Sequence, residues 1–266
     1  MSFQPIILGP GLVGWQFLQR TYESQFEAFN KTPQLNRDAS YFLEKIGNVN
    51  NAQELVSDRR LLTVALGAFG LSEDLNNRYF IQKILEDGTG SSDALANRLT
   101  DDRYKRLSDA FGFGPSEIPM TLSSTSMSEV VGLFKTQSFE IAIGELDDTM
   151  RIALYAQREL DRLANDTISE DAKWFSVMGM PPLRAMFETS LGLPTSFGQV
   201  DIDKQLEIFQ DRTNSVVGRS YISQFANPQA LEKLTNLYLA QSQIVSFNTS
   251  TSSRSTALTL LQAAGF

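Results

Sequence analysis

The sequence contains no cysteine and no histidine among its 266 residues. The absence of cysteine excludes disulfides, thiolate nucleophiles and cysteine-ligated metal ions. The absence of histidine removes the most common general base near neutral pH, together with every Ser-His and histidine–metal arrangement. An enzyme would have to use carboxylates, lysine or tyrosine. We therefore expect no catalytic residue, no cofactor and no metal ion, and we favour a non-enzymatic function.

Long hydrophobic runs and clusters of positive charge are also missing. The longest apolar runs, such as VALGAFGL at residues 64–71, are far shorter than the roughly 20 residues that span a bilayer. The net charge is −8, and lysine and arginine are interspersed among acidic residues. Nucleic acids and anionic membranes attract clustered cations, so we expect neither as a partner. No basic segment precedes the first apolar stretch, so we expect no cleaved signal peptide.

One motif has the spacing of a cofactor-binding turn. PIILGPGLVGW at residues 5–15 places Gly9, Gly11 and Gly14 at the G-x-G-x-x-G spacing of dinucleotide-binding proteins. That fold also requires a second strand, ending in an acidic residue about 20 positions on. The chain instead continues with a second helical pattern, and Asp38 lies inside it. We therefore expect residues 1–14 to form an extended arm that turns into the first helix.

The rest of the chain shows helical periodicity without the alternating strands and helices of a parallel sheet. We expect an all-α protein, a bundle-like array of many helices. Its expected organisation is a first helical lobe over 15–112, a connecting loop over 113–127, a second helical lobe over 128–247 and a tail over 248–266. The tail joins NTSTSSRST, expected to be a flexible link, to a short apolar helix over ALTLLQAAGF. Residues 128–166 are expected to form one helix, or two that meet near Gly144.

The two halves share a faint internal repeat. RRLLTVALGAFGL ends at Gly70-Leu71, and PPLRAMFETSLGL ends at Gly192-Leu193, 122 positions later. A short capped helix is expected before each of these stretches. We expect positive φ at both glycines, because each stands where a left-handed C-terminal cap would end an apolar helix. Two similar helical lobes are one interpretation. Punctuation common to helix–turn–helix units is the other, and the sequence leaves duplication open.

Several charged residues are candidates for a site. Four acidic pairs stand at or near expected helix starts, where carboxylates cap the backbone and favour the helix dipole, so we interpret them as caps rather than catalytic groups. These pairs are Asp101-Asp102, Asp147-Asp148, Glu170-Asp171 and Asp201-x-Asp203. Arginine forms planar contacts with carboxylates. The cluster Asp58-Arg59-Arg60, and Arg184 in the second repeat, therefore fit either contact with an acidic partner or the pinning of helices, which we favour.

Apolar residues are expected in one core cluster and at the two chain ends. The expected cluster contains Trp174, Phe175, Leu183, Phe187 and Leu193. The C-terminal helix is too short to be stable alone and needs a surface to bury its apolar side chains, which are Leu258, Leu260, Leu261 and Phe266. That surface is either the body of the chain, which we favour, or a neighbouring subunit or partner.

Four long stretches resemble a known family. They are LVSDRRLLTVALGAFGL, FEIAIGELDDTMRIALYAQREL, WFSVMGMPPLRAMFETSLGLPTSFGQVDIDKQLEIFQ and NPQALEKLTNLYLAQ. They are similar to the alphaproteobacterial domain-of-unknown-function family numbered 1217. The resemblance implies a helical protein whose relatives are frequently encoded near flagellar genes. It implies no established activity, cofactor or catalytic residue.

The sequence and this resemblance together predict a structural or assembly protein that acts through protein–protein contacts and is associated with the flagellum. Its expected partner is another protein or a second copy, and its location, in the cytoplasm or exported with the flagellum, is left open. The alternative is a helical small-ligand binder, or a carboxylate-based enzyme, with a cleft between the lobes.

Overall fold

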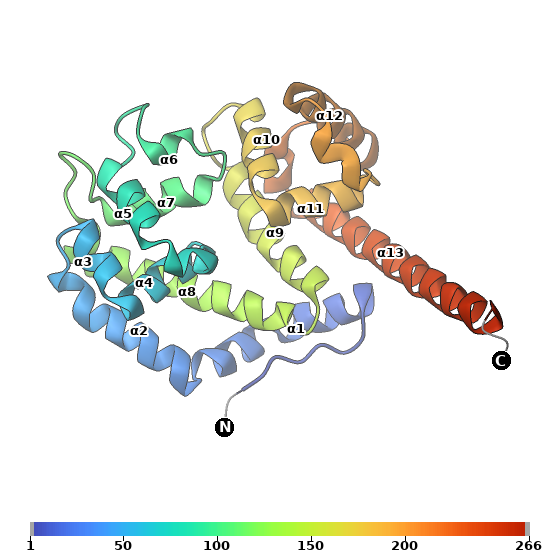
Figure 1. Ribbon diagram of the computed structural model, residues 1–266, viewed down its shortest axis with the longest axis horizontal. Coiled ribbons are helices and arrows are strands. Elements are labelled where there is room, and N and C mark those ends of the chain that lie inside the picture. Colours follow the sequence, from blue (N-terminus) through green and yellow to red (C-terminus); the bar gives the residue numbers. More distant parts are fainter. Residues whose placement is uncertain (1–2, 264–266) are drawn as a thin grey trace. The chain divides into compact units, whose positions relative to one another are not determined.

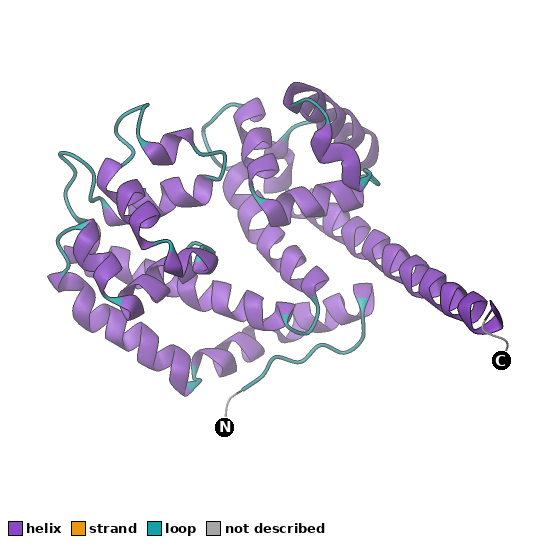
Figure 2. Cartoon of the chain, viewed as in Figure 1, coloured by secondary structure: helices purple, strands orange, loops and turns teal. Residues whose placement is uncertain are grey.

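The computed structural model describes residues 3–263, and for Thr195 and residues 248–263 it describes the backbone alone. Within these residues the chain consists of α-helices, short 3₁₀ helices and loops, without a strand (Figures 1 and 2). The expected all-α, multi-helix fold is confirmed. None of the described helices is long and apolar enough to cross a membrane.

The elements follow one another in a single order along the chain. The α-helices are α1 (Gly11–Asn30), α2 (Pro33–Lys45), α3 (Ala52–Ser57), α4 (Arg59–Ala68), α5 (Arg78–Asp87), α6 (Leu95–Arg98), α7 (Asp102–Phe111), α8 (Ser124–Gly144), α9 (Asp148–Ala164), α10 (Glu170–Gly179), α11 (Pro181–Ser190), α12 (Ile202–Val217) and α13 (Pro228–Ala263). The 3₁₀ helices are η1 (Ile46–Asn48), η2 (Ser72–Asn76), η3 (Met120–Leu122), η4 (Thr195–Gln199) and η5 (Ile222–Ala226).

The chain divides into two compact units. Unit 1 comprises Met1–Ile6 and Arg20–Glu145, and unit 2 comprises Ile7–Gln19 and Leu146–Phe266. The second part of α1 therefore belongs to unit 1 and its first part to unit 2. The sequence places the connecting loop at 113–127, but that segment contains η3 and the start of α8, and unit 1 continues to Glu145. Residues 128–166 form two helices, which are separated just after Gly144.

Unit 1 is built around α4, which packs against α2 and α8. Its inward side chains, among them Leu62 and Leu66, are fully buried. Gly67 lets α8 approach closely, since a Cβ at this position would lie 2.8 Å from the Phe134 ring. Further along α8, Phe139 is also fully buried, and its ring contacts three aromatic rings of α1, those of Tyr22, Phe26 and Phe29.

Unit 2 is built around α11, which packs against α9, α10 and α13. Trp174, Phe187 and Phe209 come from α10, α11 and α12, and all three are fully buried. The ring centroids of Trp174 and Phe187 are 5.1 Å apart, an edge-to-face arrangement that stabilises aromatic pairs.

The expected core cluster of unit 2 is only partly correct. Leu183 is fully buried with Trp174 and Phe187, whereas Phe175 and Leu193 are half-buried. Phe175 follows Trp174 directly and therefore points about 100° away around the helix. Leu193 lies beyond the glycine that ends α11.

The two units repeat one arrangement of five helices. Unit 1 uses α2, α3, α4, α5 and α8, and unit 2 uses α9, α10, α11, α12 and α13 in the same order. The contacts correspond: α2–α4, α3–α4, α3–α5, α2–α8 and α4–α8 in unit 1 match α9–α11, α10–α11, α10–α12, α9–α13 and α11–α13 in unit 2. The central helices α4 and α11 each have 10 residues, and α11 begins 122 positions after α4. The faint repeat in the sequence therefore corresponds to a repeated arrangement of helices.

Both central helices end in the same way. Gly70 has φ 71° and Gly192 has φ 62°, which confirms the expected left-handed caps. The N–H of Leu71 donates to the Leu66 carbonyl, and the N–H of Leu193 donates to the Glu188 carbonyl, each over 2.9 Å. These bonds, together with those donated by the glycine N–H groups, define a Schellman motif in each unit.

The glycines of GPGLVG form the turn from the arm into α1. Gly9 and Gly11 have φ 84° and 61°, values that side chains rarely tolerate. A Cβ on Gly14 would lie 2.0 Å from the Gly9 carbonyl oxygen, so only glycine fits there. The conformation and close approach of this turn account for all three glycines without a bound nucleotide.

Helix α13 continues through the segment that the sequence predicts as a flexible link. It runs from Pro228 to Ala263 and appears as one long helix in Figure 1. Between these residues the chain has neither glycine nor a second proline, so nothing stops a helix that adds one hydrogen bond per residue. The side chains of Leu258, Leu260 and Leu261 lie outside the described ones, and Phe266 lies outside the described residues.

Candidate functional site

The Asp58 cluster fixes the start of α4. One Asp58 carboxylate oxygen accepts hydrogen bonds from the N–H groups of Arg60 and Leu61, over 2.9 and 3.1 Å, and so caps the helix. The other oxygen accepts from the Tyr41 hydroxyl of α2, over 2.7 Å. Partial burial favours the protonated carboxyl, but the hydrogen bonds from Tyr41 and the two N–H groups outweigh it and hold the pKa of Asp58 below its ordinary value.

The two arginines beside Asp58 differ in their contacts. The Arg60 guanidinium lies 3.9 Å from the Tyr41 ring centroid and 3.4 Å from the Asp38 carboxylate, so it holds α4 to α2. Arg59 is exposed, and its guanidinium lies 3.5 Å from the Asn76 side-chain oxygen. A surface hollow of about 640 Å³ lies here, lined by α3 and by Asp58, Arg59 and Arg60.

Arg184 has a separate set of partners within unit 2. Its guanidinium donates to Glu188, one turn later in α11, over 2.7 Å, and to the Gln205 side chain of α12, over 2.6 Å. It also lies 6.0 Å from the ring centroids of Phe197 and Phe209. The contacts of Arg184 therefore join α11 to α12, as a helix-pinning residue would.

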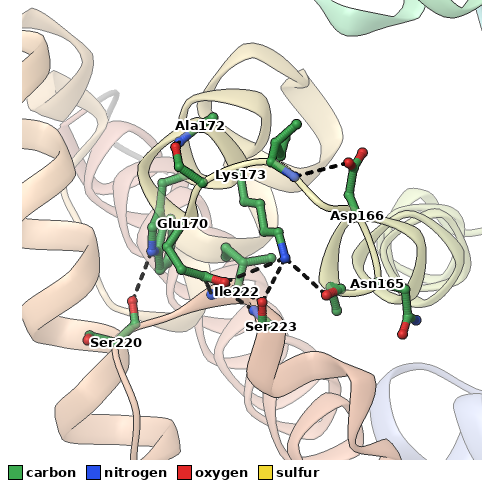
Figure 3. Close-up of polar contacts among 12 residues, drawn as sticks. Asn165, Asp166, Glu170, Ala172, Lys173, Ser220, Ile222 and Ser223 are labelled. Atoms are coloured by element: carbon green, nitrogen blue, oxygen red, sulfur yellow. Dashed lines mark hydrogen bonds and ion pairs between the residues drawn. The ribbon is translucent and has the colours of Figure 1, made fainter.

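A polar cluster that the sequence did not reveal centres on Lys173 of α10 (Figure 3). The Lys173 side chain is 4% exposed, and its ammonium donates to the Ala164 carbonyl over 3.0 Å and to the Ser223 hydroxyl over 2.7 Å. It also lies 3.5 Å from the Glu170 carboxylate. Ala164 is the last residue of α9, so the lysine charge also satisfies a carbonyl at a helix C-terminus.

Glu170 completes this cluster. Its carboxylate accepts hydrogen bonds from the N–H groups of Ile222 and Ser223, over 2.7 and 3.3 Å, and from the Ser223 hydroxyl. Partial burial favours the protonated form, but these hydrogen bonds and the Lys173 charge outweigh it, so the pKa of Glu170 lies below its ordinary value. Glu170 thus binds the backbone of η5, 52 residues further along the chain.

The chemistry of the Lys173 cluster favours a structural role. Serine and lysine form a nucleophile–base pair in some hydrolases, where the amine must accept the hydroxyl proton. Here the ammonium donates to three oxygens, and the Ser223 hydroxyl donates to Glu170. An ammonium has no lone pair with which to accept a proton. The cluster therefore joins α9, α10 and η5 and offers no activated nucleophile.

An apolar surface of unit 2 is the remaining candidate. Ile244, Val245 and Phe247 of α13 are 53%, 58% and 71% exposed, and we call these three residues the α13 surface. They border a hollow of about 630 Å³, lined also by Pro10 and Gly11 at the start of α1 and by Asp147 and Thr149 at the start of α9. Contiguous exposed apolar side chains beside a hollow are typical of interaction sites. The sequence predicted apolar ends but did not single out these residues.

Metal binding lacks a candidate among residues 3–263, where no group of three or more carboxylates is placed to hold an ion. A family model described as "Protein of unknown function (DUF1217)" matches residues 68–231. A crystal structure of a protein from Agrobacterium tumefaciens is similar in fold, with a TM-score of 0.74 and 25% sequence identity. The similarity covers 90% of this chain and 96% of that protein. No curated protein matches the sequence significantly.

Proposed function

The chain belongs to the DUF1217 family of proteins of unknown function, and from this premise we propose that it is a structural or assembly protein that acts through protein–protein contacts. The observation that carries the proposal is the α13 surface. Exposed apolar area costs roughly 25 cal/mol per Å², a cost that a docked partner removes. The charged clusters at Asp58, Lys173 and Arg184 bind their own helices, which leaves the apolar surface as the better candidate for contact.

The test is a pair of substitutions on the α13 surface. Ile244→Asp with Phe247→Asp should abolish co-purification of the partner from cells, because a charge would have to be buried at the contact. Both side chains are more than half exposed, so the thermal unfolding midpoint should stay the same. The matched control is Tyr79→Asp on α5, an exposed aromatic residue in unit 1. Undiminished co-purification with the double variant would contradict the proposal.

We extend the proposal to a flagellar partner on the basis of the family resemblance. A strain lacking the protein should then swim poorly, and the wild-type gene should restore swimming while the double α13 variant should not. Fractionation of the same strains would show whether the protein stays in the cytoplasm or is exported with the flagellum. Normal swimming of the deletion strain would count against this extension and leave the α13 surface without a flagellar role.

One observation favours a second function, the binding of a small anionic ligand. The hollow beside Arg59 exposes a guanidinium, which binds carboxylates well. Citrate at millimolar concentration should then raise the unfolding temperature of the wild type and not that of Arg59→Ala. An equal effect on both proteins would remove this alternative.

A further inference from the structure

The internal repeat shows what belongs on the α13 surface. Helix α8 of unit 1 and α13 of unit 2 begin 104 positions apart, at Ser124 and Pro228, and each follows a 3₁₀ helix. Their buried positions keep this register: Val130, Val131 and Phe134 correspond to Leu234, Thr235 and Tyr238, and all six are buried. Because α8 packs on α4 as α13 packs on α11, the register describes equivalent positions in the two units.

The register breaks down further along the helices. In α8 the next inward positions are Phe139, Glu140 and Ile143, which are at most 3% exposed. Their counterparts in α13 are Gln243, Ile244 and Phe247, all of them exposed. The same face of the repeated helix is therefore buried in unit 1 and open in unit 2.

The cover in unit 1 is a helix that presents aromatic rings. Tyr22, Phe26 and Phe29 lie at positions i, i+4 and i+7 of α1, and their ring centroids are 5.4 to 5.5 Å from that of Phe139. In unit 2 the same helix reaches α13 only with its first residue: the Gln243 side chain lies directly against Gly11, where α1 begins. The hollow of about 630 Å³ lies beside this end of α1.

We propose that the α13 surface binds an amphipathic helix of a partner protein, which presents aromatic side chains at i, i+4 and i+7 as α1 does to α8. The inference rests on the proposed function and specifies the partner. Residues 240–247 of α13, AQSQIVSF, carry no charge, so the facing side of the partner helix needs none. The one charged residue that lines the hollow is Asp147, and its carboxylate already caps α9.

The probe is a fluorescent peptide of residues 19–31, QRTYESQFEAFNK, which carries the three aromatic residues. A staple between positions 24 and 28, on the opposite helical face, holds it helical, because so short a helix is marginal in water. Fluorescence anisotropy with the full-length protein should show saturable binding. Binding should weaken at least tenfold with Ile244→Asp and Phe247→Asp together, and should be unchanged with Tyr79→Asp. A peptide in which Tyr22, Phe26 and Phe29 are replaced by alanine should fail to bind.

Three results would overturn the inference. The first is no binding of the stapled peptide, and the second is equal binding of its alanine version. The third is a wild-type dimer in light scattering that Phe247→Asp converts to a monomer, since the occupant would then be a second copy. If the double variant still loses its cellular partner while the peptide does not bind, only the aromatic-helix inference fails. If the variant keeps that partner, the proposed function fails as well.

Discussion

Gly70 and Gly192 can be tested by their backbone conformation alone. Alanine at either position is strained at positive φ and should lower the free energy of unfolding by about 1 kcal/mol. At Gly192 the cause is clear, because a Cβ there would meet no atom within 4 Å. Urea denaturation measures the loss. The matched control is Gly132 inside α8, which also has open space around it but no positive φ, so Gly132→Ala should stabilise by about 0.5–1 kcal/mol. Equal effects at positions 132 and 192 would contradict the cap assignment.

Glu170 should give the protein part of its dependence on pH. Its pKa is lower in the folded chain than in the unfolded chain, so its contribution is present above the unfolded pKa and is lost as the pH falls through the folded one. Glu170→Gln should therefore be less stable than the wild type at pH 7, and the difference should shrink as the pH falls below about 4.5. Denaturation of both proteins at pH 7 and at pH 3.5 measures it. A gap that stays constant with pH would show that the lost contacts do not depend on charge.

Local spacing in the sequence is enough to assign residues that act within one helix. Asp101, Asp147 and Asp201 cap α7, α9 and α12 as expected. Glu170 is different: it stands in the first turn of α10, whose cap is Ser169, and its carboxylate binds η5. That contact joins residues 52 positions apart, and no local pattern reports it. The burial of Lys173 was hidden for the same reason, since its partners lie on three elements.

At the scale of elements, α13 allows a direct test of the correction to the sequence-based organisation. If residues 248–263 are helical in solution, a chain that ends at Phe247 should lose the helical ellipticity at 222 nm that those residues contribute. If they form a flexible link, the total ellipticity should hardly change. Circular dichroism of the two chains at equal molar concentration decides between these outcomes. The unfolding midpoint of the shortened chain serves as the control that the body of the protein is intact.

Helix type was easier to predict from the sequence than helix extent. Apolar periodicity, capping residues and the proline starts of α11 and α13 indicate where helices begin. The end of α13 was misjudged because serine, threonine and asparagine favour loops, although the absence of glycine and proline permits a helix to continue. The α13 surface was also beyond sequence analysis, because Ile244 and Phe247 have the same periodicity as buried residues. Only the position at which α1 begins leaves them exposed.

At the scale of the whole molecule, each unit depends on its own core. Phe187 is fully buried and packs against Trp174 and Phe225, so Phe187→Ala should cost about 3–5 kcal/mol of stability. Trp174 reports the transition by fluorescence, since its ring lies 5.1 Å from that of Phe187. Leu122→Ala, at a side chain that is 71% exposed, should cost less than about 0.5 kcal/mol. A loss of that small size at Phe187 would place this residue outside the core.

The division of α1 between the units has a consequence for the order of synthesis. Residues 7–19 leave the ribosome almost first, yet they belong to unit 2, whose other residues begin at Leu146. Unit 1 can close once Glu145 has been made, whereas Trp15 and Leu18, which are 5% and 0% exposed in the finished protein, must wait for the second half of the chain. During translation these two side chains are the exposed apolar surface that chaperones recognise. The nascent chain thus carries a temporary binding site for chaperones, which the last helices to be made remove.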